Sequence, residues 1–150
     1  MRLLEDKVNE PQFQGMADWQ VAEILNAADE NLPVLYQNVA KEDLISILMI
    51  GDKWLEIKEN AKGSIDIPIN RLCSTIFDAL TMGGAIFHLT DTKVLTAFSG
   101  ILNNLLTNNL IDNTIYSEVI AKVTRNQSWA EHNNVKVTAR TVGIARGGVA

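Results

Sequence analysis

The feature that most constrains the fold is a run of apolar residues at helical spacing between Val94 and Leu106. The run comprises Val94, Leu95, Phe98, Ile101, Leu102, Leu105 and Leu106, whose intervals of three and four place them on one face of a helix. A stripe of this width has to be covered by neighbouring helices. We therefore expect this helix, which Thr90 or Asp91 would cap, to lie at the centre of a helical domain.

Weaker stripes of the same period predict further helices on either side. One begins at Asp18, which would act as its cap, and places Trp19, Ala22 and Leu25 on one side as far as about Ala28. A long helix over 41–62 follows, with Leu44, Ile47, Leu48, Gly51, Trp54 and Leu55 on its apolar stripe. Gly51 costs about 1 kcal/mol of helix propensity relative to alanine, so it marks a close helix contact or a kink.

Two more long helices are predicted from their start signals. Asp66 stands two residues before Pro68, a combination that favours a helix start, and Gly83 and Gly84 would end this helix. Asp112 or Thr114 would cap the second helix, which Ile115, Val119, Ile120 and Val123 line.

The last third of the chain carries a compact set of local signals. Ser128 with Glu131 three residues later is a capping box, so Trp129 is expected to pack beneath a short helical turn. A turn at 133–134 leads to a brief extended piece over 135–137. Thr138 would then cap a last helix that Gly147 and Gly148 stop.

These signals predict an all-α fold. We expect a single helical domain of about five longer helices, a short C-terminal helical module and an extended N-terminal arm, because 150 residues fit one domain. Residues 1–16 are polar, contain Pro11 and Gly15 and show no sustained period, so they are assigned to the arm. Residues 17–125 form the predicted helical body and residues 126–150 the basic C-terminal module.

The formal charge of −5 is unevenly distributed along the chain. Up to Ala121 there are 8 Lys and Arg against 17 Asp and Glu, whereas the remainder holds five basic residues and Glu131 alone. Such a division orients contacts between copies or directs the tail to an acidic partner or to nucleic acid. A merely solvated basic end is the alternative. The candidate partner-binding residues are Lys136, Arg140 and Arg146.

Groups suited to catalysis or metal binding are few. His88 and His132 are 44 residues apart and lie in no metal-ligand spacing, while Cys73 lies among apolar residues and is expected to be buried. The acidic pairs at 42–43 and 56/59 stand beside lysines on predicted helix surfaces. Neither a GxGxxG nor a GxxxxGK[ST] motif is present. We expect no enzymatic activity, no catalytic residues, no metal and no cofactor.

Hydropathy predicts neither a membrane span nor export. The longest apolar stretch, Leu44 to Ile50, is far shorter than the ~20 residues that cross a bilayer. The N-terminus lacks the apolar segment of a secretory signal, and a single cysteine fits synthesis in a reducing cytoplasm.

Nucleic-acid binding is the less favoured alternative for the tail. Residues 114–146 are predicted to form helix, turn, short helix, turn and helix with basic side chains, the layout of a helix-turn-helix. Counted from Ala130, however, the glycine position of that motif holds Asn134 and its later apolar position holds Arg140. An apolar anchor for a recognition helix is therefore missing.

Residues 128–147 read SWAEHNNVKVTARTVGIARG. This segment resembles the C-terminal signature of a family of small tailed-bacteriophage proteins, in which a SWAE box precedes a turn, a VxVT step and a VxxARG ending. Looser matches run from Met16-Ala17-Asp18-Trp19 to Leu32-Pro33 and from Thr90-Asp91 to Leu105-Leu106.

The resemblance implies a phage context and a role in the virion or its assembly, as a capsid, connector, tail or baseplate accessory protein made in the host bacterial cytoplasm. Its partners would be other phage structural proteins, in multiple copies within a symmetric assembly. Trp129 and Val142 would hold the tail on the helical body and leave Lys136, Arg140 and Arg146 exposed. The alternative is a small phage regulator that binds nucleic acid or a host protein.

Overall fold

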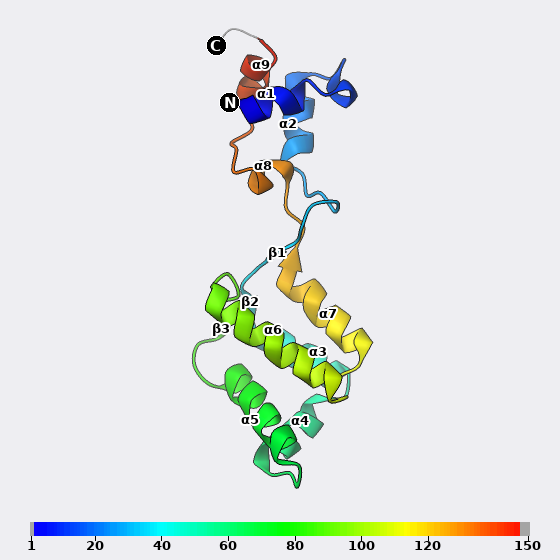
Figure 1. The fold of residues 1–150 in the computed structure, drawn as a ribbon, viewed down its shortest axis with the longest axis vertical. Helices are drawn as coiled ribbons and strands as arrows, with labels where there is room; N and C mark the ends of the chain where they lie inside the picture. Colours follow the sequence, from blue (N-terminus) through cyan, green and yellow to red (C-terminus); the bar gives the residue numbers. More distant parts are fainter. Residues whose placement is uncertain (1, 148–150) are drawn as a thin grey trace. The chain divides into compact units, whose positions relative to one another are not determined.

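The computed structural model describes residues 2–147 and is mostly helical, with tiny two-stranded sheets, so the fold is not strictly all-α. Met1 and residues 148–150, which include the predicted helix stop Gly148, lie outside the described residues. The chain forms two compact units: unit 1 is built from residues 1–35 and 126–150, and unit 2 from residues 36–125. The elements of both are labelled in Figure 1.

Unit 2 contains the predicted central helix. Its helices are α3 (Lys41–Ile50), α4 (Trp54–Lys62), α5 (Ile67–Thr81), α6 (Thr92–Thr107) and α7 (Asn113–Val123). The carboxylates of Asp66, Asp91 and Asp112 accept hydrogen bonds from backbone N–H groups in the first turns of α5, α6 and α7. The predicted start at Asp66 is therefore confirmed, and of the alternatives the caps are Asp91 rather than Thr90 and Asp112 rather than Thr114. Phe98, Leu102 and Leu105 of α6 are buried among residues of α3, α5 and α7.

The single long helix predicted over 41–62 is wrong, because the chain turns at its middle and forms α3 and α4. Gly51 follows the last residue of α3, and Asp52 adopts a left-handed backbone with φ of 60°. A Cβ on Gly51 would lie 2.6 Å from Cδ1 of Ile115 on α7. Of the two interpretations of Gly51, a close helix contact or a kink, the close contact is therefore confirmed.

Four short strands complete the described part of unit 2 and its borders. β2 (Val39–Ala40) pairs antiparallel with β3 (Ile86–Phe87), with Val39 opposite Phe87. β1 (Leu35–Tyr36) pairs with β4 (Thr124–Arg125). The predicted extended piece over 135–137 forms no strand, since its backbone groups bond to α8 and α2 instead.

Unit 1 is assembled from the two ends of the chain. It contains α1 (Arg2–Val8), the 3-10 helix η1 (Pro11–Phe13), α2 (Asp18–Asn26), α8 (Trp129–His132) and α9 (Ala139–Ala145). Figure 1 shows α1 and α2 beside α9, and α8 at the end of α2, although more than 100 residues separate them in the sequence. Ser128 and Thr138 cap α8 and α9 as predicted.

The extended arm predicted for residues 1–16 is wrong. Leu4, Val8 and Phe13 are buried, with relative exposures of 0%, 2% and 3%. They form one cluster with residues of α2, α8 and α9, which include Val21, Leu25 and Val142. Leu4 and Val8 stand four residues apart, so α1 presents both on one face, and burial of that face offsets the entropy lost on ordering a polar segment.

The structure also divides the chain differently from the predicted 17–125 body and 126–150 module. Residues 17–35 belong with the C-terminal segment in unit 1, because α2 packs against α8 and α9. Trp19, predicted on the buried side of α2, is 61% exposed, since the buried arc is centred on Val21, Ala22 and Leu25. Ala17 rather than Asp18 occupies the cap position.

No helix among residues 2–147 is both long and apolar enough to cross a membrane.

Candidate functional site

Lys136 and Arg140 lie on the surface of unit 1, as predicted. Lys136 belongs to the segment between α8 and α9, and Arg140 is the second residue of α9. Both side chains are exposed, and neither forms an ion pair within the described residues. They are free to contact another molecule.

Arg146 does not share this arrangement, because its guanidinium turns inward. Nη1 donates to the carbonyl oxygen of Met16 at 2.7 Å and lies 3.0 Å from Oδ1 of Asp18. Nη2 donates to the carbonyl oxygen of Phe13 at 2.6 Å, and the side chain is only 22% exposed. The expectation of an exposed Arg146 is therefore corrected: this residue fastens the end of α9 to η1 and the start of α2.

The two-unit fold removes most of the charge asymmetry seen along the sequence. The whole of unit 1 contains five Lys and Arg and eight Asp and Glu, whereas unit 2 contains eight and ten. The basic C-terminal segment is thus joined to the acidic N-terminal segment within one unit. Neither unit carries the net positive charge that typifies a nucleic-acid-binding domain.

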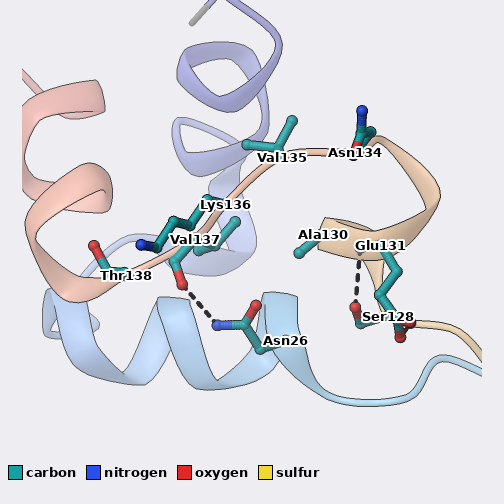
Figure 2. Close-up of a pocket in the computed structure, with 9 residues that line it drawn as sticks. All are labelled: Asn26, Ser128, Ala130, Glu131, Asn134, Val135, Lys136, Val137 and Thr138. Atoms are coloured by element: carbon teal, nitrogen blue, oxygen red, sulfur yellow. Dashed lines mark hydrogen bonds between the residues drawn. The ribbon is translucent and has the colours of Figure 1, made fainter.

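An open groove of about 590 Å³ lies beside Lys136 in unit 1. Figure 2 shows its lining, which α2, α8 and the segment between α8 and α9 provide: Asn26, Ser128, Ala130, Glu131, Asn134, Val135, Lys136, Val137 and Thr138. Nδ2 of Asn26 donates to the carbonyl oxygen of Val137 at 2.8 Å across the groove. This bond ties the otherwise irregular segment to the last residue of α2.

The polar groups around this groove are mainly occupied by local structure. Oγ of Ser128 accepts from the N–H of Glu131 at 3.1 Å, and Oε1 of Glu131 accepts from the N–H of Ser128 at 3.2 Å. The buried Gln127 donates through Nε2 to the carbonyl oxygen of Pro33 at 2.7 Å and lies 3.1 Å from Nδ1 of His132. The groove therefore offers a contact surface of mixed polarity with the ammonium of Lys136 at its edge.

The cysteine and histidines are placed in separate environments. Cys73 is fully buried in unit 2, as predicted, and burial, assisted by the negative charge of Glu56, raises the pKa of its thiol to about 11. The thiol is thus neutral at physiological pH, and a neutral buried thiol is a poor nucleophile. His88 and His132 are both exposed. Across residues 2–147, no group of three or more His, Cys, Asp or Glu side chains is arranged to hold a metal ion.

Sequence reasoning missed an apolar surface where α3 meets α4 in unit 2. Met49, Ile50 and Leu55 are 61%, 85% and 61% exposed. In an unbroken helix Leu55 would lie on the buried stripe. Because the chain turns at Gly51 and Asp52, α4 has a different orientation, in which Ile57 is buried and Leu55 is exposed. The adjacent Gly51 and Asp52, both common in turns, were the available signal.

Comparison of the chain with models of known protein families, with curated protein sequences and with solved structures gave no match.

Proposed function

We propose that this protein is a non-enzymatic structural or assembly component of a bacteriophage virion, and that it acts through protein–protein contacts. The observation that carries the proposal is the exposed apolar surface at the junction of α3 and α4, formed by Met49, Ile50 and Leu55. Met49 and Leu55 line one shallow hollow together with Trp54, and contiguous exposed apolar patches mark sites of contact with other proteins. This junction is a docking surface in the assembled state.

The phage context of the proposal rests on the resemblance of residues 128–147 to the tailed-phage signature. The apolar signature residues serve the fold: Val142 is fully buried and Trp129 packs against the core of unit 1. Lys136 and Arg140 stay on the surface, so they are the basic residues of the signature that a partner would meet. In a particle built from many copies, individually weak contacts of this kind hold collectively.

Quantitative mass spectrometry of purified phage particles tests the proposal. A virion component is expected at a constant number of copies per particle after the particles are separated from host proteins. Complete absence of the protein from purified particles would contradict the proposal.

A matched pair of variants connects particle incorporation to the apolar surface. Ile50→Glu is expected to reduce incorporation several-fold, because a carboxylate would be desolvated in the contact. Ile65→Glu, in the loop after α4 and fully exposed at 104%, is the control and should leave incorporation unchanged. Equal incorporation of both variants would remove the α3–α4 surface from the contact.

The alternative is a regulator that binds nucleic acid, which a gel shift with the purified protein tests. The exposed Lys136 and Arg140 favour it, whereas the net negative charge of each unit opposes it. A gel shift whose affinity falls steeply with salt, together with absence from particles, would favour the regulator.

A further inference from the structure

The groove beside Lys136 in unit 1, here termed the 134–138 groove, contains backbone groups that no part of the described chain satisfies. Within residues 2–147, the N–H groups of Lys136 and Val137 and the carbonyl oxygen of Val135 take part in no hydrogen bond. Val137 is nevertheless only 6% exposed. Buried backbone N–H groups without a partner are rare in folded proteins, so such a donor in the lining of a groove indicates a place for an acceptor from another molecule.

The neighbouring backbone groups explain why these three are left over. The N–H of Val135 donates to the carbonyl oxygen of Ala130 at 2.9 Å, which ties the segment to α8. The carbonyl oxygen of Val137 accepts from Nδ2 of Asn26 at 2.8 Å, which ties it to α2 (Figure 2). The segment is thus held at two points, and between them it belongs to no helix or strand that would use its remaining groups.

The charged residues of the groove favour a ligand with a carboxylate. They are Lys136 and Glu131, and Figure 2 shows them toward opposite ends of the groove. The carboxylate of Glu131 is already engaged, because Oε1 accepts from the N–H of Ser128 in the capping box of α8. The ammonium of Lys136 is exposed and has no ion-pair partner within residues 2–147, so it is the charge available to a ligand.

We propose that the 134–138 groove binds an extended peptide segment of another virion protein through its main chain, with a carboxylate side chain of that peptide against Lys136. A peptide main chain carries N–H and C=O groups in alternation, so one segment supplies acceptors to the free N–H groups and a donor to the carbonyl oxygen of Val135. The groove volume of about 590 Å³ is of the size that ligand sites have. This inference rests on the proposed function and deepens it, since it names the chemistry of the partner.

Selection from a display library of short random peptides against the full chain tests the charge that the groove prefers. The wild-type chain is expected to enrich peptides that carry Asp or Glu at one fixed position. Lys136→Glu should lose these peptides and enrich peptides with Lys or Arg at that position instead, because the substitution reverses the charge. Arg140→Glu is the matched control and should select the same peptides as the wild-type chain, since Arg140 is equally exposed but lies outside the groove lining.

Nuclear magnetic resonance of the isotope-labelled full chain with one selected peptide tests the main-chain contacts. The amide protons of Lys136 and Val137 are expected to shift downfield, because each gains a hydrogen bond. Methylation of the peptide backbone nitrogens, one at a time, should weaken binding about ten-fold at the position that donates to Val135, because a methylated nitrogen has no proton to donate.

Three results would overturn the proposal: a wild-type chain that enriches no peptide, selected peptides that bind Lys136→Glu as well as they bind the wild-type chain, or bound peptides that leave the amide protons of Lys136 and Val137 unshifted. Circular dichroism of both variants should show the wild-type helical signal, which separates loss of binding from loss of folding. A chain that is absent from particles but binds such peptides would reject the virion role alone. A particle component that binds none would reject the peptide site alone.

Discussion

The guanidinium of Arg146 lies 3.0 Å from Oδ1 of Asp18, a residue 128 positions earlier in the chain. The same guanidinium donates to the carbonyl oxygens of Met16 and Phe13, so one side chain holds the end of α9 against η1 and the start of α2. A basic residue that looked like part of an exposed tail is therefore an internal fastener of unit 1.

Replacement of Arg146 by alanine is expected to lower the free energy of unfolding of unit 1 by about 1–3 kcal/mol. Most of this loss would come from the two carbonyl acceptors, because the partly exposed ion pair with Asp18 contributes little in water. Urea denaturation followed through Trp129 fluorescence, with Trp19 and Trp54 both replaced by phenylalanine, would report unit 1. Trp54 would report unit 2 in a separate variant.

Arg140→Ala is the matched control for Arg146→Ala, because Arg140 lies on the same helix with an exposed side chain. Its effect should stay within about 0.5 kcal/mol. Equal destabilisation by the two substitutions would contradict the role assigned to Arg146.

The N-terminal segment yields a second prediction. Leu4→Ala should destabilise unit 1 by about 2–5 kcal/mol, because Leu4 is fully buried and its truncation leaves a cavity. Leu3→Ala, at a neighbouring position that is 49% exposed, should cost less than about 1 kcal/mol. A chain that starts at Met16 would lack Leu4, Val8 and Phe13 and should leave unit 1 unfolded, as measured by loss of chemical-shift dispersion from residues 126–147.

Gly51 provides a prediction about overpacking. Gly51→Ala would place a Cβ 2.6 Å from Cδ1 and 2.8 Å from Cγ1 of the buried Ile115, so it should destabilise unit 2 by about 1–3 kcal/mol. The double variant with Ile115→Val, which removes Cδ1, should recover part of that loss in a double-mutant cycle.

Gly100→Ala on α6 is the control for the Gly51 prediction, because a Cβ there meets no atom within 4 Å. It should stabilise unit 2 by about 0.4–1 kcal/mol through higher helix propensity. Thermal denaturation of Gly51→Ala, Ile115→Val, their double variant and Gly100→Ala measures both effects, and a stabilised Gly51→Ala variant would show that the contact with Ile115 is loose.

We expect unit 2 to lose stability at alkaline pH because of the buried thiol of Cys73. Because burial raises the pKa of its thiol from 9.0 to about 11, the unfolded chain ionises first as the pH increases. The contribution of this thiol to stability is complete below pH 9 and declines by about 2–3 kcal/mol as the pH rises through 11. Cys73→Ala should flatten this part of the stability profile in urea titrations between pH 8 and pH 11, and an unchanged slope would contradict the burial of the thiol.

Local sequence signals predicted most of the helix starts. Ser128 and Thr138 accept the capping hydrogen bonds expected of them, and of the paired alternatives the caps are Asp91 and Asp112, whereas Asp18 does not cap α2. Capping depends on groups within three residues of one another, so the sequence contains the necessary information. The close contact at Gly51 was also predictable as one of two alternatives, because a glycine on an apolar stripe lowers helix propensity and so indicates either a close neighbouring helix or a kink.

The pairing of the two chain ends was beyond such reasoning. Leu4 and Val8 have helical spacing, but nothing near them in the sequence indicates that Val142 and Ala145 would cover them. The distribution of charge along the sequence suggested that the acidic N-terminal segment and the basic C-terminal segment were separate surfaces. In the fold the two segments, which carry opposite charges, belong to the same unit. The exposed apolar surface at the junction of α3 and α4 was missed for a related reason, because one residue with positive φ, Asp52, changed which side of the next helix is buried.

The central claim is that both ends of the chain form one cooperative unit and that residues 36–125 form another. Hydrogen–deuterium exchange of the intact Leu4→Ala variant tests it most directly, because the substitution lies in the N-terminal segment alone. We predict that residues 2–35 and 126–147 lose protection together and to the same extent, while residues 36–125 keep wild-type protection. Loss of protection limited to residues 2–35, with residues 126–147 exchanging as in the wild-type chain, would contradict the account.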